Sequence, residues 1–291
     1  MKKPESAANV GDRAAAASDE AVKRAMAAIQ SRRPDEAERI VGEVLAQNSR
    51  HLGALHLLGV ALMAQGRAGE AVAKLEAAAR ARSDPAIETH LAMALRQTGR
   101  SAEAIEWLER ATARQPAFAP AFQELGVLLF SLRRFDRAEA VLRRGLELAP
   151  AMPELSVVLG GIFLDRADRA NAKLAFARAL VNAPGHPGAL FGIGTALMDG
   201  GEFAPAAERF KQALACDPTY DQARLNLGLC LLELGRTEEA MECLRAAAQA
   251  APQFYAKALK TLVTAGRSRF WLKPSAAAAM LRPKWPAAIR A

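Results

Sequence analysis

Cysteine and histidine are the residue types best suited to metal binding or nucleophilic chemistry, and the chain has three cysteines and four histidines. Cys216, Cys230 and Cys243 include no C-x-x-C pair, and an odd number at this spacing argues against a disulfide framework or a zinc site. We expect them to be small apolar core residues. The histidines form no H-E-x-x-H motif, although His56 and His90 are placed to face each other from adjacent helices.

The rest of the chain carries no signature of a catalytic or cofactor site. It has no Gly-rich phosphate loop and no G-x-S-x-G motif. Its many carboxylates lie in segments such as 201–210 and 237–244, at spacings typical of solvated helix faces and i,i+4 pairs. The sequence therefore predicts no catalytic residue, no bound metal and no cofactor, and a protein that is not an enzyme.

The element that would position any site is a pair of short amphipathic helices, seen most clearly in 221–254. Apolar residues recur there at spacings of three and four, which is typical of one helical face, and Gly235 separates the two helices. The same pattern recurs every 34 residues back to residue 18, with one single-residue deletion. One position is alanine in all copies: Ala37, Ala71, Ala104, Ala138, Ala172, Ala206 and Ala240. Another is glycine or alanine: Ala25, Gly59, Ala92, Gly126, Gly160, Gly194 and Gly228.

This period, with Leu-Gly, A-x3-F/L and a terminal proline, resembles the tetratricopeptide repeat (TPR) family. The terminal proline occurs in five copies: Pro116, Pro150, Pro184, Pro218 and Pro252. The tryptophan that the family carries at the fourth position is replaced, for example by Leu55 and Phe122. The resemblance covers 18–254 and implies an all-α fold, a right-handed α-solenoid of helix-turn-helix repeats in which each hairpin buries its apolar face against its neighbours.

The predicted organisation is seven repeats with three flanking segments. Residues 1–17 show no periodicity and are expected to be disordered. Residues 255–266 are expected to form a C-terminal capping helix, followed by a basic, Trp-containing tail over 267–291. The repeats are expected at 18–51, 52–84, 85–118, 119–152, 153–186, 187–220 and 221–254.

The family resemblance also implies that the first helix of each repeat lines a concave groove where ligands bind. Most residues at those positions are apolar, and an adaptable, Met-containing surface suits a hydrophobic or amphipathic peptide. Only Arg96 is basic, which disfavours the carboxylate-gripping mode of chaperone-binding relatives. The expected peptide-binding residues are His56, Val60, Met63, Met93, Arg96, Gln123, Val127, Phe130, Val157, Leu164, Phe191, Met198, Leu225 and Leu229, with Asp165, Asp199 and Glu233 along an acidic rim.

The net charge of +8 is concentrated at the C-terminal end. From Arg267 onward the chain has six basic residues and no acidic one, which leaves +2 for everything before it. The expected tail anchors are Phe270, Trp271, Leu272 and Trp285. Three docking sites for this tail are open: the acidic-rimmed groove of the same chain, the groove of a second copy in a homo-oligomer, and an anionic membrane surface.

These patterns predict a non-enzymatic scaffold or adaptor that binds a protein or peptide partner in its groove. A first alternative is a peripheral membrane-associated assembly factor docked through the tail. A second is a helical-repeat RNA-binding protein, which is disfavoured because the groove has no Lys or Arg rows. Without a secretory signal or a run of eighteen apolar residues, the cytoplasm is the default location, and the chain is expected to be a monomer or a tail-mediated homo-oligomer.

Overall fold

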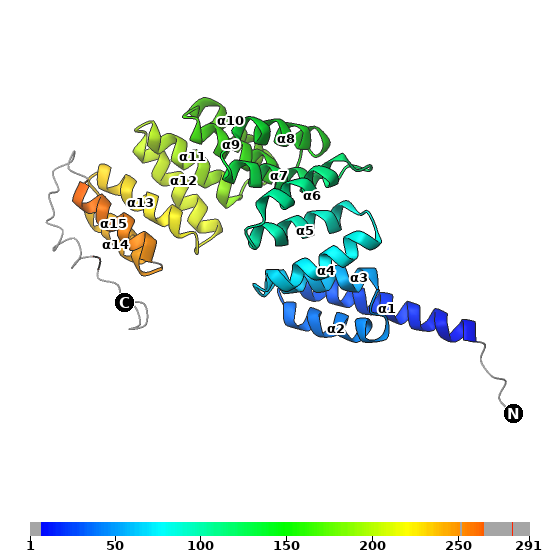
Figure 1. Cartoon of the computed structure of the whole chain (residues 1–291). Coiled ribbons are helices and arrows are strands. Elements are labelled where there is room, and N and C mark those ends of the chain that lie inside the picture. The colour runs from blue at the N-terminus through cyan, green and yellow to red at the C-terminus, as the bar shows by residue number, and fades with distance from the viewer. Residues whose placement is uncertain (1–6, 251, 265–280, 282–291) are drawn as a thin grey trace. The chain divides into compact units, whose positions relative to one another are not determined.

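The computed structural model describes residues 7–250, 252–264 and 281, with side chains over 16–250, 253–260 and at 281. Within this part of the chain there are fifteen α-helices and no strand. The chain divides into two compact units, Met1–Leu148 and Ala149–Ala291 (Figure 1). Each unit is a series of helical hairpins, so the predicted all-α solenoid class is confirmed.

The first unit contains four hairpins. Its helices are α1 (Ala7–Gln30), α2 (Pro34–Gln47), α3 (Leu52–Ala64), α4 (Ala68–Ala81), α5 (Pro85–Gln97), α6 (Ser101–Ala113), α7 (Ala119–Ser131) and α8 (Phe135–Leu148). From α3 onward, the first helix of each hairpin begins at the first residue of a predicted repeat. We refer to the odd-numbered helices as first helices and to the even-numbered ones as second helices.

The second unit contains three further hairpins and a final helix. Its helices are α9 (Pro153–Asp165), α10 (Arg169–Asn182), α11 (Pro187–Asp199), α12 (Phe203–Cys216), α13 (Asp221–Glu233), α14 (Thr237–Ala250) and α15 (Pro252–Thr264). Proline occupies the first turn of α9 and α11, where its missing N–H would have no helical partner anyway.

The expectation of disorder over 1–17 is wrong for residues 7–17, because α1 begins at Ala7. The physical reason is composition: 14–17 is a run of alanines, the residue with the highest helix propensity, and it continues directly into the first repeat. Residues 1–6 lie outside the described residues. At the other end, α15 begins at Pro252, three residues before the capping helix that the sequence predicts.

The core of each hairpin forms where small residues let two helices approach closely. All seven alanines of the invariant row are 0% exposed. The glycine row lies against large side chains of the second helix. A Cβ added to Gly126 would lie 2.4 Å from Leu142 Cδ2, and one added to Gly160 would lie 2.6 Å from Phe176 Cε1. The repeating small residues therefore provide the space that the repeating Leu and Phe side chains occupy.

Candidate peptide-binding surface

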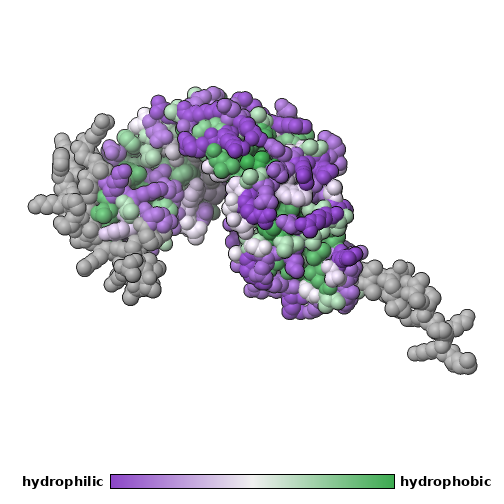
Figure 2. Space-filling view, in the orientation of Figure 1, coloured by the Kyte–Doolittle hydropathy of each residue, from purple (hydrophilic) through white to green (hydrophobic). Residues whose placement is uncertain are grey.

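Eight of the predicted binding residues lie on three first helices of the first unit, α3, α5 and α7. They are His56, Val60, Met63, Met93, Arg96, Gln123, Val127 and Phe130. All eight are partly exposed, and α5 contacts both α3 and α7. We call these eight residues the α3–α5–α7 surface. In Figure 2, apolar patches show between polar side chains on the visible face of this unit.

A pair of neutral histidines links α3 to α5. His56 Nε2 and His90 Nδ1 are 2.8 Å apart, and the two ring centroids are 4.9 Å apart. Burial, together with the neighbouring His90, lowers the pKa of His56 to about 4, and burial also lowers the pKa of His90. The two rings are therefore uncharged at neutral pH. They also face each other, as their positions in the sequence predict.

A second polar pair links α5 to α7. Arg96 Nη2 lies 3.6 Å from Glu124 Oε2, which is longer than a hydrogen bond. Oε2 is buried and has no hydrogen-bond partner. Burial raises the pKa of Glu124, and the charge of Arg96 only partly opposes this shift. Glu124 is absent from the predicted peptide-binding residues. The signal that could have identified it is a single carboxylate on a first-helix face that is otherwise apolar.

Among the corresponding residues of the second unit, one is buried and another packs against aromatic rings. Leu225 is only 2% exposed and belongs to a buried cluster that extends from α11 to α15, so its assignment to an open groove is wrong. Phe191 packs against the rings of Phe210 and Tyr220, with centroid distances of 5.7 and 4.9 Å. The partly exposed members that remain on α9, α11 and α13 are Val157, Leu164, Phe191, Met198 and Leu229.

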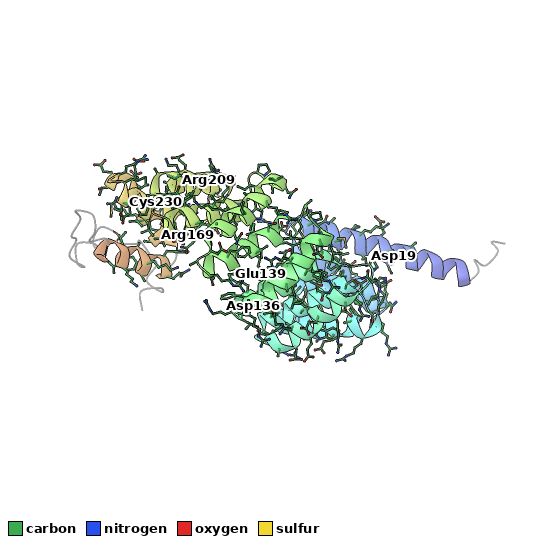
Figure 3. All side chains as sticks on the ribbon, turned by 90° about the horizontal axis from the view of Figure 1, so that it is seen from above. Asp19, Asp136, Glu139, Arg169, Arg209 and Cys230 are labelled. Carbon is green, nitrogen blue, oxygen red and sulfur yellow. The ribbon has the colours of Figure 1, made fainter. Side chains whose placement is uncertain are left out.

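The three predicted rim acids, Asp165, Asp199 and Glu233, are exposed and are the last residues of α9, α11 and α13. Negative charge is unfavourable at a helix C-terminus, because the last carbonyl groups already carry partial negative charge. The rim is not purely acidic, however. The guanidinium of Arg169, labelled in Figure 3, donates a hydrogen bond of 2.9 Å to the carbonyl oxygen of Asp199.

The charged residues at the start of several second helices pair locally, as expected for solvated faces. Arg67, Arg100 and Arg236 each form two short hydrogen bonds to the glutamate three residues later, at 2.6–2.8 Å. Exposed pairs of this kind contribute little to stability. These charges therefore need no ligand to explain them.

The cysteines are free thiols. Burial raises the pKa of Cys230 to about 12 and also raises that of Cys243, so both are held as unreactive thiols. Cys216 is exposed, so the prediction of a core role is wrong for that residue. Across the described residues, no three His, Cys, Asp or Glu side chains come close enough together to hold a metal ion. No helix in that part of the chain is long and apolar enough to cross a membrane.

These hairpins and their small-residue rows define an α-helical repeat scaffold. The chain belongs to the tetratricopeptide repeat family, whose repeat it matches over 62–127, 95–156 and 197–263 and, in a second description of the same repeat, over 22–86 and 157–221. Proteins of this family are generally non-enzymatic scaffolds for protein–protein interaction. A comparison with curated proteins gives no match.

Solved structures with the same fold come from different organisms. The human IFIT1 dimer with PPP-AAAA matches 91% of this chain and 67% of its own, with a TM-score of 0.70 and 15% identity. A chain of the APC/C hetero-tetramer Cut9–Hcn1 gives a TM-score of 0.69 at 15% identity over 78% of this chain, which spans 45% of that one. A thermophilic TPR protein of Thermus thermophilus, TTC0263, gives 0.55 at 22% identity, over 62% of this chain and 99% of its own. At these identities the likeness shows the fold alone.

Proposed function

We propose that this chain is a non-enzymatic scaffold that holds a hydrophobic or amphipathic segment of a partner protein against the α3–α5–α7 surface. The observation that carries this proposal is the exposure of its apolar members. Val60, Met63, Met93, Val127 and Phe130 are partly exposed, whereas the apolar rows beneath them are buried. Apolar side chains left accessible on three neighbouring helices gain free energy when a partner covers them.

The first unit is favoured over the second as the binding site. In the second unit Leu225 is buried and Phe191 packs against two aromatic rings, whereas all eight members of the α3–α5–α7 surface are partly exposed. Methionine at two of the eight positions supports a surface that adapts to more than one side-chain shape. A helix or an extended segment with apolar residues on one side is the partner that fits this chemistry.

No observation among the described residues supports either alternative function, membrane docking through the tail or RNA binding. The tail anchors Phe270, Trp271, Leu272 and Trp285, on which membrane docking depends, lie outside the described residues. RNA binding requires rows of cations facing the phosphates, and Arg96 is the one basic residue of the α3–α5–α7 surface.

Selection from a random-peptide library on the full chain tests the proposal. We expect peptides with apolar residues at helical or alternating spacing to be enriched. A synthetic copy of such a peptide should lose affinity by about tenfold or more for Met93→Glu, which places a charge on the α3–α5–α7 surface. The matched control is Ala73→Glu on the exposed side of α4, which should leave the affinity unchanged. Failure to enrich any peptide, or equal losses in the two variants, would exclude this binding site.

A further inference from the structure

We propose that a pocket between α4 and the α2–α3 connection, residues 48–51, binds an acidic side chain of a partner protein. The pocket has a volume of about 660 Å³, within the range of roughly 300–1,000 Å³ that is usual for ligand sites. Most of its lining comes from the second helix α4, and none of the eight residues of the α3–α5–α7 surface lines it. The site is therefore separate from the proposed peptide-binding surface.

In two other repeats, an arginine of the chain itself occupies the space beside the fourth repeat position. In the third repeat this position is Glu88, and Arg114 Nη2 lies 2.7 Å from Glu88 Oε1. In the fourth repeat it is Phe122, and the guanidinium carbon of Arg144 lies 5.7 Å from the centroid of its ring. Both arginines follow the fourth position on the second-helix side of their hairpin.

The second repeat has alanine at both of these arginine positions. Ala81 is equivalent to Arg114, Ala77 is equivalent to Arg144, and the fourth position is Leu55. All three residues of the second repeat line the pocket. In the third repeat, where Arg114 is present, the corresponding pocket is smaller, about 370 Å³. The pocket of the second repeat is therefore space that a side chain from outside can enter.

The charge around the pocket is positive. Arg50, Lys74 and Arg80 line it, and no acidic residue does. Arg80 donates a hydrogen bond of 3.0 Å to Glu76, whereas Arg50 and Lys74 form no ion pair within the part of the chain that the structure describes. The carboxylate of Glu70 interacts with Lys74 only at longer range. Because Arg50 and Lys74 are exposed, an anionic group of a partner can reach both.

The lining favours an aspartate or glutamate over other groups. A carboxylate gains charge-assisted hydrogen bonds from both cations, a neutral group gains weaker ones, and a lysine or arginine is repelled. Leu55, Ala73 and Ala77 form an apolar wall against which the CH₂ groups of the acidic side chain can pack. In the third repeat the chain itself places a carboxylate, that of Glu88, at the equivalent position. The lining has no aromatic residue on which a nucleic-acid base could stack.

The first experiment is a selection from a random-peptide library on the full chain, with counter-selection against the variant Lys74→Glu. We expect the enriched peptides to share an Asp or Glu. A synthetic copy should lose affinity by about tenfold or more for Lys74→Glu, and its affinity should fall as salt is added. The matched control is Arg24→Glu, an exposed cation on α1, where the same change of charge should alter the affinity by less than about twofold.

A second variant tests the pocket without changing the charge. Ala77→Leu fills the space beside Leu55 and should weaken binding of the same peptide by about tenfold. Its control is Ala177→Leu, at an exposed position of α10, which should have no effect. An unchanged affinity for Ala77→Leu would overturn the inference, because binding would then depend on surface charge alone.

The remaining outcomes are equally decisive. Failure to enrich an acidic peptide, or equal losses for Lys74→Glu and Arg24→Glu, would overturn the inference. An RNA oligonucleotide that binds through Lys74 in the absence of any acidic peptide would overturn it as well. Met93→Glu on the α3–α5–α7 surface should leave the acidic peptide bound, so failure at this pocket and failure of the proposed function are distinguishable.

Discussion

One position in each hairpin turn adopts a left-handed backbone, and it is not always glycine. Gly66, Gly99, Gly201 and Gly235 occupy it with φ between 74° and 81°. In the other three hairpins the equivalent residues are Arg32, Arg133 and Ala167, with φ between 56° and 59°. A side chain with a Cβ is strained in this region, so three turns of the chain are strained relative to the other four.

Glycine at one of the strained turns should stabilise the chain. We expect Ala167→Gly to raise the free energy of unfolding by about 0.5–1 kcal/mol, because the relief of the left-handed strain exceeds the added entropy of the unfolded chain. The control is Ala177→Gly, at an exposed position in the middle of α10, which should lower stability by about 1 kcal/mol. Urea denaturation of both variants measures the difference. A loss of stability in Ala167→Gly would contradict the assigned backbone conformation.

His56 should make stability depend on pH in a defined window. Its pKa is near 4 in the folded chain, mainly through burial and also through His90, with Asp84 and Arg82 acting in opposite directions. The ordinary value is 6.5, so the unfolded chain binds a proton first as pH falls. Stability is therefore lost between about pH 6.5 and 4, by roughly 2 kcal/mol at pH 5.

The variant His56→Gln isolates that contribution. Urea denaturation at pH 7 and pH 5 should show a smaller difference for this variant than for the wild-type chain. The raised pKa of Glu124 acts in the opposite sense, stabilising the folded state at low pH, but it is present in both proteins and cancels in the comparison. Identical pH dependence in the two proteins would mean that His56 is solvated.

How far the polar residues of the surface could be predicted depends on their repeat positions. The contact between His56 and His90 could be predicted, because the two residues lie on adjacent first helices. The structure contains this contact. The pairing of Arg96 with Glu124 could not be predicted, because helical period alone does not show that a carboxylate is buried without a hydrogen bond. Burial of that kind depends on how tightly α5 and α7 pack.

Among the helices, α9, α10 and α11 meet at one aromatic ring, Phe176 of α10, which lies against one glycine of α9 and one of α11. A Cβ at Gly160 on α9 would lie 2.6 Å from Phe176, and one at Gly192 on α11 would lie 2.3 Å from the same ring. Phe176 is only 2% exposed, so the ring has little room to move away. Contact between successive hairpins of the second unit therefore depends on the absence of a side chain at Gly192.

We expect Gly192→Ala to destabilise the chain by about 1–3 kcal/mol through overpacking against Phe176. In a Phe176→Leu background the same change should cost clearly less, because the smaller side chain leaves space for the added methyl group. The control Gly42→Ala, on α2, meets nothing within 4 Å and should instead stabilise by up to about 1 kcal/mol. Equal costs of Gly192→Ala in the two backgrounds would argue against this packing.

The helices themselves were largely predictable, because the period, the small-residue rows and the prolines all indicate the same boundaries. From α3 onward, each predicted repeat start up to Asp221 coincides with the start of a helix. The failures lie at the ends of the array. The helix that begins at Ala7 extends N-terminally beyond the repeat pattern. Leu225 is buried at a position where the residues of the earlier repeats are partly exposed, except Thr89, which is also buried.

At the scale of the whole molecule, one residue of the C-terminal tail belongs to the core of the second unit. Leu281 is 0% exposed and joins the buried cluster that includes Leu225, Leu244 and Ala258. This contact is made within the same chain, and docking of the tail in its own chain is one of the three arrangements that the sequence leaves open. The anchors proposed for that docking, Trp271 and Trp285 among them, lie outside the described residues.

We expect Leu281→Ala to destabilise the second unit by about 2–5 kcal/mol, the usual cost of truncating a buried leucine. Because each hairpin of a repeat protein contacts only its neighbours, faster hydrogen exchange should be confined to α13, α14 and α15. Exposed Leu174 on α10 is the control, and Leu174→Ala should change little. Unchanged exchange in Leu281→Ala would show that the tail does not dock in the same chain.

Hydrogen–deuterium exchange of the full chain, with and without a saturating library-selected peptide, tests peptide binding most directly. It follows every helix of both units in one experiment. The proposed function predicts slower exchange in α3, α5 and α7, with the second helices α4 and α6 little changed. Protection confined to α4 and α6, or to helices of the second unit, would contradict binding on the α3–α5–α7 surface.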